Sequence, residues 1–334
     1  KYGLIMATYK EIKGTQIEVL ASDPSNPVEG QVWFNSTSGA VKGKILAAAS
    51  GWATGTALNT GRQNAAAAGV SNSSGLCFGG AEPTITAKTE SYNGSAWTEV
   101  ADLNQARRDL GGSGTQTSAL AYGGAESVPT ASAKTNKWNG STWTEVADMP
   151  TAKYVYAGCA GADNESALAF GGYTTGIVAT TEEWNGSGWT AKADLNTARY
   201  SLAGGGIVTS ALAFGGYTTA QQALTEHYNG TCWTVKNVMN TARYNLGGTG
   251  ATYDSAMAFG GQPGLGGSSA NTELFTGTNW AESGDLNSAR VAIRGSGTTT
   301  SALAFGGEGP PPARPFTEEW NAAGASITKT FTTS

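Results

Sequence analysis

The chain has few charged residues, few cysteines and a single histidine, and each shortage excludes a class of protein. Charged residues make up 13% of the 334 residues and the net charge is -5, so no basic surface for nucleic acid is expected. The 3 cysteines are too few and too scattered for a disulfide framework or a metal cluster. No apolar run approaches the roughly 20 residues of a membrane-spanning helix. We therefore expect no cofactor, no nucleic-acid partner and no membrane insertion.

Glycine, by contrast, is abundant, with 48 residues, and much of it lies in a repeat. A Gly-Gly pair recurs at intervals of 44 to 48 residues, and a tryptophan follows each of the first five pairs. The pairs begin at Gly79, Gly123, Gly171, Gly215, Gly260 and Gly306, and the tryptophans are Trp97, Trp143, Trp189, Trp233 and Trp280. A fixed period of this length, built from short strands, is typical of a propeller or a solenoid.

Each repeat contains four candidate strands. The second alternates small and large side chains, as in Ser166–Phe170, so Leu168 and Phe170 are expected on one face and two alanines on the other. The third and fourth flank an Asn-Gly pair such as Asn185-Gly186, which favours a two-residue hairpin turn. Six such units predict an all-β fold, a six-bladed β-propeller with four antiparallel strands per blade. A linear solenoid is the alternative, but it needs capping units that the sequence lacks.

Ring closure is predicted from a tryptophan outside the repeats. The sixth unit has Ala323–Thr328 where the others carry tryptophan, whereas Trp52 stands alone before the first unit. We expect Gly51–Thr56 to pack beside a C-terminal strand, Ile327–Phe331, and to fasten the ring. The propeller domain is thus expected to span residues 51–334.

Residues 1–50 lie outside the repeat and form a separate N-terminal segment. Gly30–Asn35 and Ala40–Lys44 flank the polar turn Ser36–Gly39, which is a β-hairpin pattern. A lone hairpin buries too little apolar surface to be stable in water. The segment is therefore expected to dock on the propeller, on sister copies or on another protein, and attachment to another protein is the favoured interpretation.

Two resemblances follow from these motifs. The Gly-Gly pair, the spaced aromatic residues and the four-strand unit resemble kelch repeats, although the aliphatic residues before Gly-Gly are thinned to Ala-Leu-Ala-Phe. The stretch from Asp23 to Gly39, with Asn-Pro and Gly-Gln-Val-Trp-Phe-Asn, is similar to a module of bacteriophage tail-fibre and other virion proteins. Joined to kelch-like repeats rich in Gly, Ala and Thr, it resembles marine phage structural proteins.

One basic residue per repeat opens the first strand: Arg62, Arg107, Lys153, Arg199, Arg243 and Arg290. Such a ring could bind an anion or an acidic glycan near a central channel. An acid or amide recurs in step on the third strand: Glu90, Asn136, Glu182, Glu226, Glu273 and Glu318. Residues that repeat in step are better explained as structural partners, so we expect a structural basic ring.

No catalytic constellation is evident, and we expect a protein that is not an enzyme. Copper oxidases with kelch-like blades use His and Tyr ligands and a thioether-linked Cys, but His227 is the single histidine here and varies between repeats. Six-bladed sialidases carry Asp boxes, and the Asn-Gly turns lack the aspartate. The expected arginine cluster, acid/base pair and tyrosine nucleophile are also missing.

Binding specificity is expected in the loops after Gly-Gly, which differ most between repeats. They are 81–88, 125–134, 173–179, 217–224, 262–271 and 308–315. These loops should share a face with the links between blades, and Tyr173, Tyr217 and Arg314 are the candidate contacts because aromatics and arginine dominate binding hot spots.

The resemblances and the loops together suggest a non-enzymatic phage virion structural protein of tail-fibre or adhesin type. Residues 1–50 would anchor it to other tail or capsid proteins, and the propeller would present a face to a host-surface glycan or protein. One alternative is a head or tail decoration protein with purely structural contacts. Another is a secreted carbohydrate-binding or carbohydrate-active propeller protein, and a homo-oligomer stays open.

Overall fold

The computed structural model describes residues 17–24, 30–46, 50–127, 129–154, 159–264, 266–309, 314–323 and 326–331. These residues form strands and loops without any helix, so the part described contains no helix able to span a membrane. The chain separates into two compact units, Lys1–Ala49 with Ala323–Ser334, and Ser50–Ala322. The expected all-β class is confirmed.

The larger unit contains six four-stranded antiparallel sheets, numbered here along the chain. Sheet 1 is β5 (Ala66–Ser71), β6 (Ser74–Phe78), β7 (Thr89–Tyr92) and β8 (Trp97–Val100). Sheet 2 is β9 (Gly111–Gly114), β10 (Ala119–Tyr122), β13 (Thr135–Trp138) and β14 (Trp143–Val146). Sheet 3 is β15 (Cys159–Ala160), β16 (Ala167–Phe170), β17 (Thr181–Trp184) and β18 (Trp189–Lys192).

The remaining sheets follow the same plan until the last strand. Sheet 4 is β19 (Ala203–Ile207), β20 (Ser210–Phe214), β21 (Thr225–Tyr228) and β22 (Trp233–Lys236). Sheet 5 is β23 (Gly247–Thr252), β24 (Ser255–Phe259), β25 (Thr272–Phe275) and β26 (Trp280–Glu282). Sheet 6 is β27 (Arg294–Gly297), β28 (Ser301–Phe305), β29 (Thr317–Asn321) and, from the start of the chain, β4 (Gly51–Gly55). A short extra hairpin, β11 (Ala125–Ser127) with β12 (Thr130–Ala131), lies in the loop after Gly123-Gly124.

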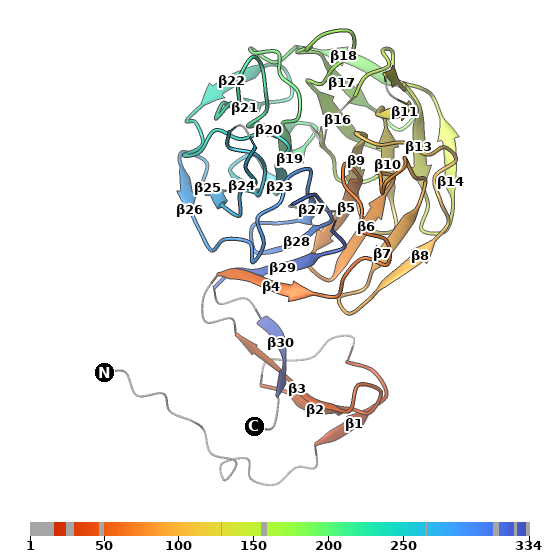
Figure 1. Ribbon diagram of the computed structural model, residues 1–334, viewed down its shortest axis with the longest axis vertical. Helices are drawn as coiled ribbons and strands as arrows, with labels where there is room; N and C mark the ends of the chain where they lie inside the picture. The colour runs from red at the N-terminus through yellow and green to blue at the C-terminus, as the bar shows by residue number, and fades with distance from the viewer. Residues whose placement is uncertain are drawn as a thin grey trace. The chain divides into compact units, whose positions relative to one another are not determined.

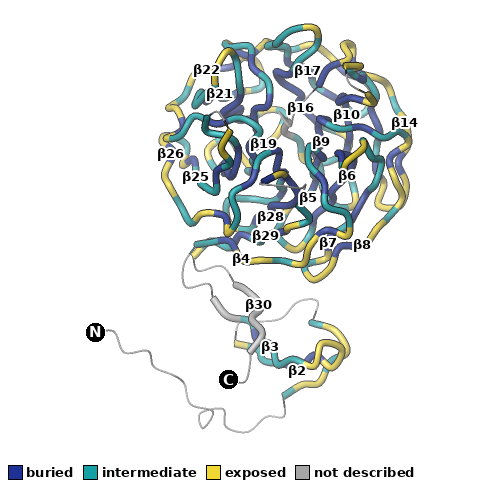
Figure 2. Tube along the Cα trace, viewed as in Figure 1, coloured by how far each residue is buried: buried dark blue, intermediate teal, exposed yellow. Residues whose placement is uncertain are grey.

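The sheets are arranged radially around a common centre, with the first strand of each innermost (Figure 1). The innermost strands contact one another in the order β5, β9, β15, β19, β23, β27, and β27 contacts β5. Buried residues concentrate in the second strand of each sheet, such as β10 and β16 (Figure 2). The arrangement is propeller-like.

Alternation of large and small side chains explains how the sheets stack. Leu168 and Phe170 pack against Ala211 and Ala213 of the next sheet, while Ala167 and Ala169 of the same strand lie against side chains of sheet 2. Strand β16 therefore offers bulky side chains to the following sheet and a flat alanine surface to the preceding sheet. This confirms the predicted division of its faces. Close packing of this kind is what buried apolar surface requires.

A tryptophan of each sheet joins it to the sheet before. Its indole N–H donates to a threonine hydroxyl at 2.9 to 3.1 Å: Trp143 to Thr89, Trp189 to Thr135, Trp233 to Thr181, Trp280 to Thr225, Trp52 to Thr272 and Trp97 to Thr317. The same rings pack on a Phe or Tyr of the preceding sheet at centroid distances of 4.9 to 5.0 Å. The Trp52 contact replaces the tryptophan missing from the sixth repeat.

The predicted closure was right about Trp52 and wrong about its partner strand. Strand β4 pairs with β29, with Trp52 opposite Trp320. Strand β30 (Ser326–Phe331) instead pairs with β3 (Ala40–Leu46) of the smaller unit. Strand β30 thus belongs to the sheet of the smaller unit, and the compact unit that contains the six sheets spans Ser50–Ala322. The physical reason is that β4 already fills the outer position of sheet 6.

The Asn-Gly turns also differ from the expected two-residue hairpin. Trp138 pairs with Trp143, which leaves a four-residue loop. The Asn139 side chain accepts the N–H groups of Ser141 and Thr142 at 2.9 Å, and Gly140 adopts a φ of 95°. Asparagine thus stabilises the loop through its side chain, and only the glycine needs positive φ.

The smaller unit is a four-stranded sheet in the order β1 (Glu18–Leu20), β2 (Val32–Asn35), β3 and β30. The predicted hairpin is present as β2 and β3, and β1 adds a parallel strand. Asp23 connects the elements: its carboxylate accepts from Trp33 Nε1 and Asn35 Nδ2 and pairs with Lys42 at 2.7 Å. The extra edge strands explain how a segment that looked too small for a fold forms its own sheet.

Candidate functional site

The six basic residues, which precede the innermost strands, are fully buried, each with 0% exposure. In five sheets the partner is the glutamate of the third strand. The N–O distances are 3.0 Å for Arg62–Glu90, 3.0 Å for Lys153–Glu182, 2.5 Å for Arg199–Glu226, 2.8 Å for Arg243–Glu273 and 2.6 Å for Arg290–Glu318. Five of the six cations thus face carboxylates in the interior, which agrees with the interpretation of the ring as structural.

The four arginine–glutamate pairs also hold the backbone around them. Arg243 Nη1 donates to the carbonyls of Gly260 and Asn271 at 2.8 and 2.7 Å, and Glu273 Oε2 accepts the N–H of Asn240 at 2.7 Å. The Arg290 carbonyl accepts the N–H of Gly261 at 2.8 Å, which links sheet 5 to sheet 6. Burial lowers the pKa of Arg243, and Glu273 opposes that effect. The basic ring is therefore scaffold.

Sheet 2 departs from this pattern. Arg107 donates to the amide oxygen of Asn136 instead of a carboxylate, and the Asn136 amide donates to Asn104 Oδ1 at 3.0 Å. Burial without a close carboxylate lowers the pKa of Arg107 to about 10. The sheet keeps its geometry with a neutral partner but lacks the ion pair.

Five tyrosines follow one another across sheets 3, 4 and 5, and we call them the tyrosine arc. Successive ring centroids are 6.3 Å apart for Tyr154–Tyr173, 5.8 Å for Tyr173–Tyr200, 5.6 Å for Tyr200–Tyr217 and 5.0 Å for Tyr217–Tyr244, all edge-to-face. Tyr154 is buried and the other four are half-buried. The predicted Tyr173 and Tyr217 thus belong to one surface, joined through Tyr200.

The backbone holds these rings in place. Tyr154 and Tyr173 exchange two N–H···O bonds of 2.9 and 3.0 Å, and Tyr200 and Tyr217 exchange two of 3.1 and 2.8 Å. Tyr244 forms the equivalent pair with Gln262. Each bridge joins the residue after the ring basic residue to the residue after Gly-Gly. The arc is therefore part of the rigid frame, although half of it lies in variable loops.

Sequence reasoning missed Tyr154, Tyr200 and Tyr244. Their signal was available, because a tyrosine directly follows the ring basic residue in repeats 3, 4 and 5 and in no other repeat. What the sequence did not supply was the bridge that places this position beside the one after Gly-Gly. Burial raises the pKa of Tyr200 and of Tyr244, so their hydroxyls stay protonated at neutral pH.

Arg314 lies elsewhere, in the loop of sheet 6. Its N–H donates to the Gly307 carbonyl at 2.8 Å, and its guanidinium lies 5.2 Å from the centroid of the Phe316 ring. Phe316 is 40% exposed. The structure therefore groups two of the three predicted contacts and assigns the third to a separate cation–π pair.

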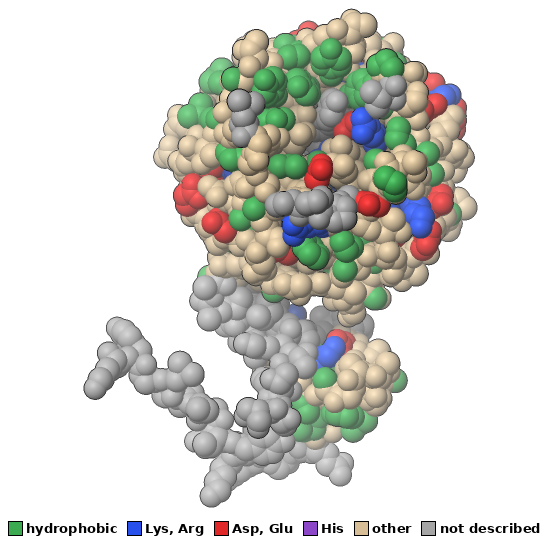
Figure 3. Space-filling view, viewed as in Figure 1, with side chains coloured by type: hydrophobic (Ala, Val, Ile, Leu, Met, Phe, Trp, Pro, Cys, Tyr) green, Lys and Arg blue, Asp and Glu red, His purple; other side chains and the backbone are tan. Residues whose placement is uncertain are grey.

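Charge divides the loops after Gly-Gly into two sets. The loops of sheets 3, 4 and 5, at 173–179, 217–224 and 262–271, contain no charged residue. Each loop of sheets 1, 2 and 6 contains one acid and one base: Glu82 and Lys88, Glu126 and Lys134, Glu308 and Arg314. In the space-filling view hydrophobic side chains gather over β16 to β22, while red and blue side chains lie mainly over the other sheets (Figure 3). The tyrosine arc lies within the uncharged half.

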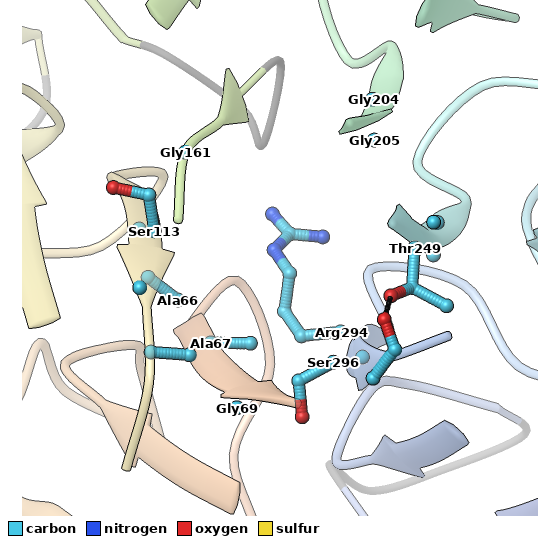
Figure 4. Close-up of a pocket in the computed structure, with 18 of the residues that line it drawn as sticks. Ala66, Ala67, Gly69, Ser113, Gly161, Gly204, Gly205, Thr249, Arg294 and Ser296 are labelled. Atoms are coloured by element: carbon cyan, nitrogen blue, oxygen red, sulfur yellow. Dashed lines mark hydrogen bonds between the residues drawn. The ribbon is translucent and has the colours of Figure 1, made fainter. Parts of the chain in front are cut away.

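A cavity of about 100 Å³ occupies the centre of the ring. Its walls are mostly glycine, alanine and hydroxyl side chains of the innermost strands, and the Arg294 guanidinium projects toward its middle (Figure 4). Arg294 Nε donates to the Ala65 carbonyl at 2.8 Å and Nη1 to its neighbour Ile293 at 2.9 Å. Arg294 thus joins sheet 6 to sheet 1, at a position where other sheets carry Ala or Gly.

Asp109 is a buried acid that sequence reasoning also missed. It has a φ of 54° and 1% exposure, and Oδ2 lies 3.2 Å from Arg108 Nε while Oδ1 has no hydrogen-bond partner. Burial raises its pKa to about 6. Asn64 and Asn245 occupy the same position in sheets 1 and 5, also with positive φ. The site favours asparagine, so the aspartate is a local departure that costs stability.

The described residues hold no metal-ligand cluster. No group of three or more His, Cys, Asp or Glu that could hold a metal occurs among them. His227 stacks on Tyr253 at a centroid distance of 3.8 Å, and burial lowers its pKa. No protein-family model and no curated protein sequence matches the chain.

Proposed function

We propose that the chain is a six-bladed kelch-like β-propeller that serves as a non-enzymatic adhesion protein of a phage particle. The cyclic contacts support six blades, because Trp97 bonds back to Thr317 and the Gly307 N–H bonds to the Arg62 carbonyl at 3.0 Å. The kelch and virion assignments rest on the sequence resemblances given above. In this proposal the smaller unit attaches to other virion proteins and the larger unit meets the host.

The observation that carries the proposal is the asymmetry of one face. The contacts between sheets repeat around the ring, yet the loops after Gly-Gly are uncharged over sheets 3 to 5, with a tyrosine in the first two, and carry opposite charges over the others. Loops on a rigid scaffold usually provide recognition. A decoration protein with purely structural contacts is the competing function.

Binding of the fluorescently labelled full chain to a panel of marine bacterial cells tests the proposal. We expect saturable binding to some strains and at least tenfold weaker binding when Tyr173 and Tyr217 are both replaced by Ala. The matched control replaces Thr98 and Thr144, which are exposed on outer strands, and should bind as the parent does. A folded parent that binds no strain, or a tyrosine variant that binds normally, would overturn the adhesion proposal and favour decoration.

A further inference from the structure

The tyrosine arc has the properties of a preformed platform. Four of its rings are half-buried, and each is fixed by edge-to-face contact with its neighbours and by the backbone bridges described above. Tyrosine offers a large contact area with little conformational entropy to lose. Rings that are already ordered cost less to immobilise when a ligand binds. The arc is therefore suited to recognition by stacking.

Polar groups without charge border the rings. Gln221 pairs through its backbone with Tyr217, and Gln262 pairs with Tyr244. Gln221 Nε2 also donates to the Pro263 carbonyl at 3.1 Å, which joins the loops of sheets 4 and 5. Thr174 and Thr218 follow the two loop tyrosines. Amides and hydroxyls of this kind supply donors and acceptors next to apolar rings.

The absence of charged residues from the three loops around the arc disfavours nucleic acids and acidic polymers as ligands. Nucleic acid requires cations beside the bases that stack, and acidic polymers require arginine or lysine, but the three loops around the arc contain neither. A neutral sugar presents an apolar C–H face for an aromatic ring and hydroxyls around its rim for amides.

We infer that the tyrosine arc binds an uncharged oligosaccharide, with sugar C–H groups packed against Tyr173, Tyr200, Tyr217 and Tyr244 and sugar hydroxyls bonded to Gln221 and Gln262. This inference rests on the proposed adhesion function and specifies its ligand. A protein receptor is the other class of macromolecule that an aromatic surface could meet. The uncharged polar border favours the sugar.

The test is a titration of the purified full chain with neutral oligosaccharides of glucose, galactose, mannose and N-acetylglucosamine, with uronic-acid oligomers for comparison. Calorimetry should detect a neutral oligosaccharide whose affinity changes less than twofold between low and high salt. Tyr200→Ala and, in a second protein, Gln262→Ala should each weaken it at least tenfold. Tyr253→Ala is the matched control, since Tyr253 is half-buried but stacks on His227 outside the arc.

The outcomes separate this inference from the function on which it depends. If arc variants lose cell binding but no neutral oligosaccharide binds, or if binding requires uronic acids, the ligand class is wrong and adhesion stands. If cell binding through the arc survives periodate oxidation of cell glycans and is abolished by protease, the receptor is a protein. If Gln262→Ala and Tyr200→Ala both fold and bind a neutral oligosaccharide like the parent, the arc is not the site.

Discussion

Replacing Glu226 by Gln is the sharpest test of how the ring is held together. The carboxylate faces Arg199 at 2.5 Å and accepts both the backbone N–H and the side-chain amide of Asn196 at 2.7 Å. Arg199 is 0% exposed and Glu226 is 1% exposed. The substitution keeps the shape of the side chain but leaves a buried guanidinium without its counter-charge.

The magnitude follows from burial. Breaking a buried ion pair from one side costs about 3–5 kcal/mol because the remaining charge stays out of water, whereas removing both charges costs much less. We therefore expect Glu226→Gln and Arg199→Met each to lower the free energy of unfolding by about 3–5 kcal/mol. The double variant should lose at least about 2 kcal/mol less than the sum of the single losses, because contacting residues couple by up to about 3 kcal/mol.

Urea unfolding of the four proteins, followed by tryptophan fluorescence, measures this cycle. Glu183→Gln is a matched control, since Glu183 lies on β17, is half-buried and faces Lys192 at a 3.3 Å surface contact. It should change stability by less than about 1 kcal/mol. Losses that add within about 0.5 kcal/mol would refute direct coupling, and a Glu226→Gln protein as stable as the control would refute the structural role of the ring.

Three further perturbations test other parts of the structure. Trp52→Ala removes the indole that contacts Phe259, Trp320 and Thr272 and should cost about 3–5 kcal/mol; a thermal melt like that of the parent would contradict closure through β4. Asn136→Glu should restore the missing ion pair and stabilise the protein by about 1–3 kcal/mol, measured by urea unfolding, and a loss of stability would show that sheet 2 has no room for the carboxylate. Asp109→Asn concerns a carboxyl whose folded pKa, about 6, lies above its ordinary 3.8. Since burial favours the protonated acid, the parent loses stability as pH rises through 4 to 6. The variant should therefore be more stable by about 2–3 kcal/mol above pH 6 and equal below pH 4, and a gap independent of pH would mean that Asp109 does not titrate in this range.

The repeat made most of the ring predictable, and the exceptions have local causes. The ion pairs followed from residues that recur in step, and Trp52 was identified because one repeat lacked its tryptophan. The partner of β4 could not be predicted, because Thr317–Asn321 and Ile327–Phe331 are both plausible strands and the choice depends on the smaller unit accepting β30. The Asn-Gly loops were mispredicted because an asparagine side chain can stabilise a longer loop by itself.

The candidate site was half predictable for a related reason. Tyr173 and Tyr217 were found because they lie in loops that vary, whereas Tyr200 and Tyr244 follow ring arginines and looked like part of the scaffold. Only the backbone bridges between the two positions bring all of them together. Asp109 and Arg294 were missed because each differs from the residues at the same position in the other repeats. A comparison that looks for residues shared between repeats does not detect such positions.

The contacts that hold the sheets together do not explain why some loops after Gly-Gly are charged and others are not. Sheets 3 and 4, whose loops are uncharged, and sheets 1 and 6, whose loops carry both signs, all use the same Trp–Thr bond, buried ion pair and Gly-Gly contact. A loop can therefore change from Tyr-Thr-Thr to Glu-Gly-Pro while the Trp–Thr bond, the buried ion pair and the Gly-Gly contact are all kept. Stability alone would leave such residues scattered around the ring, whereas the tyrosines occupy three consecutive sheets with every ring touching the next. Contiguity is what a ligand larger than one side chain requires.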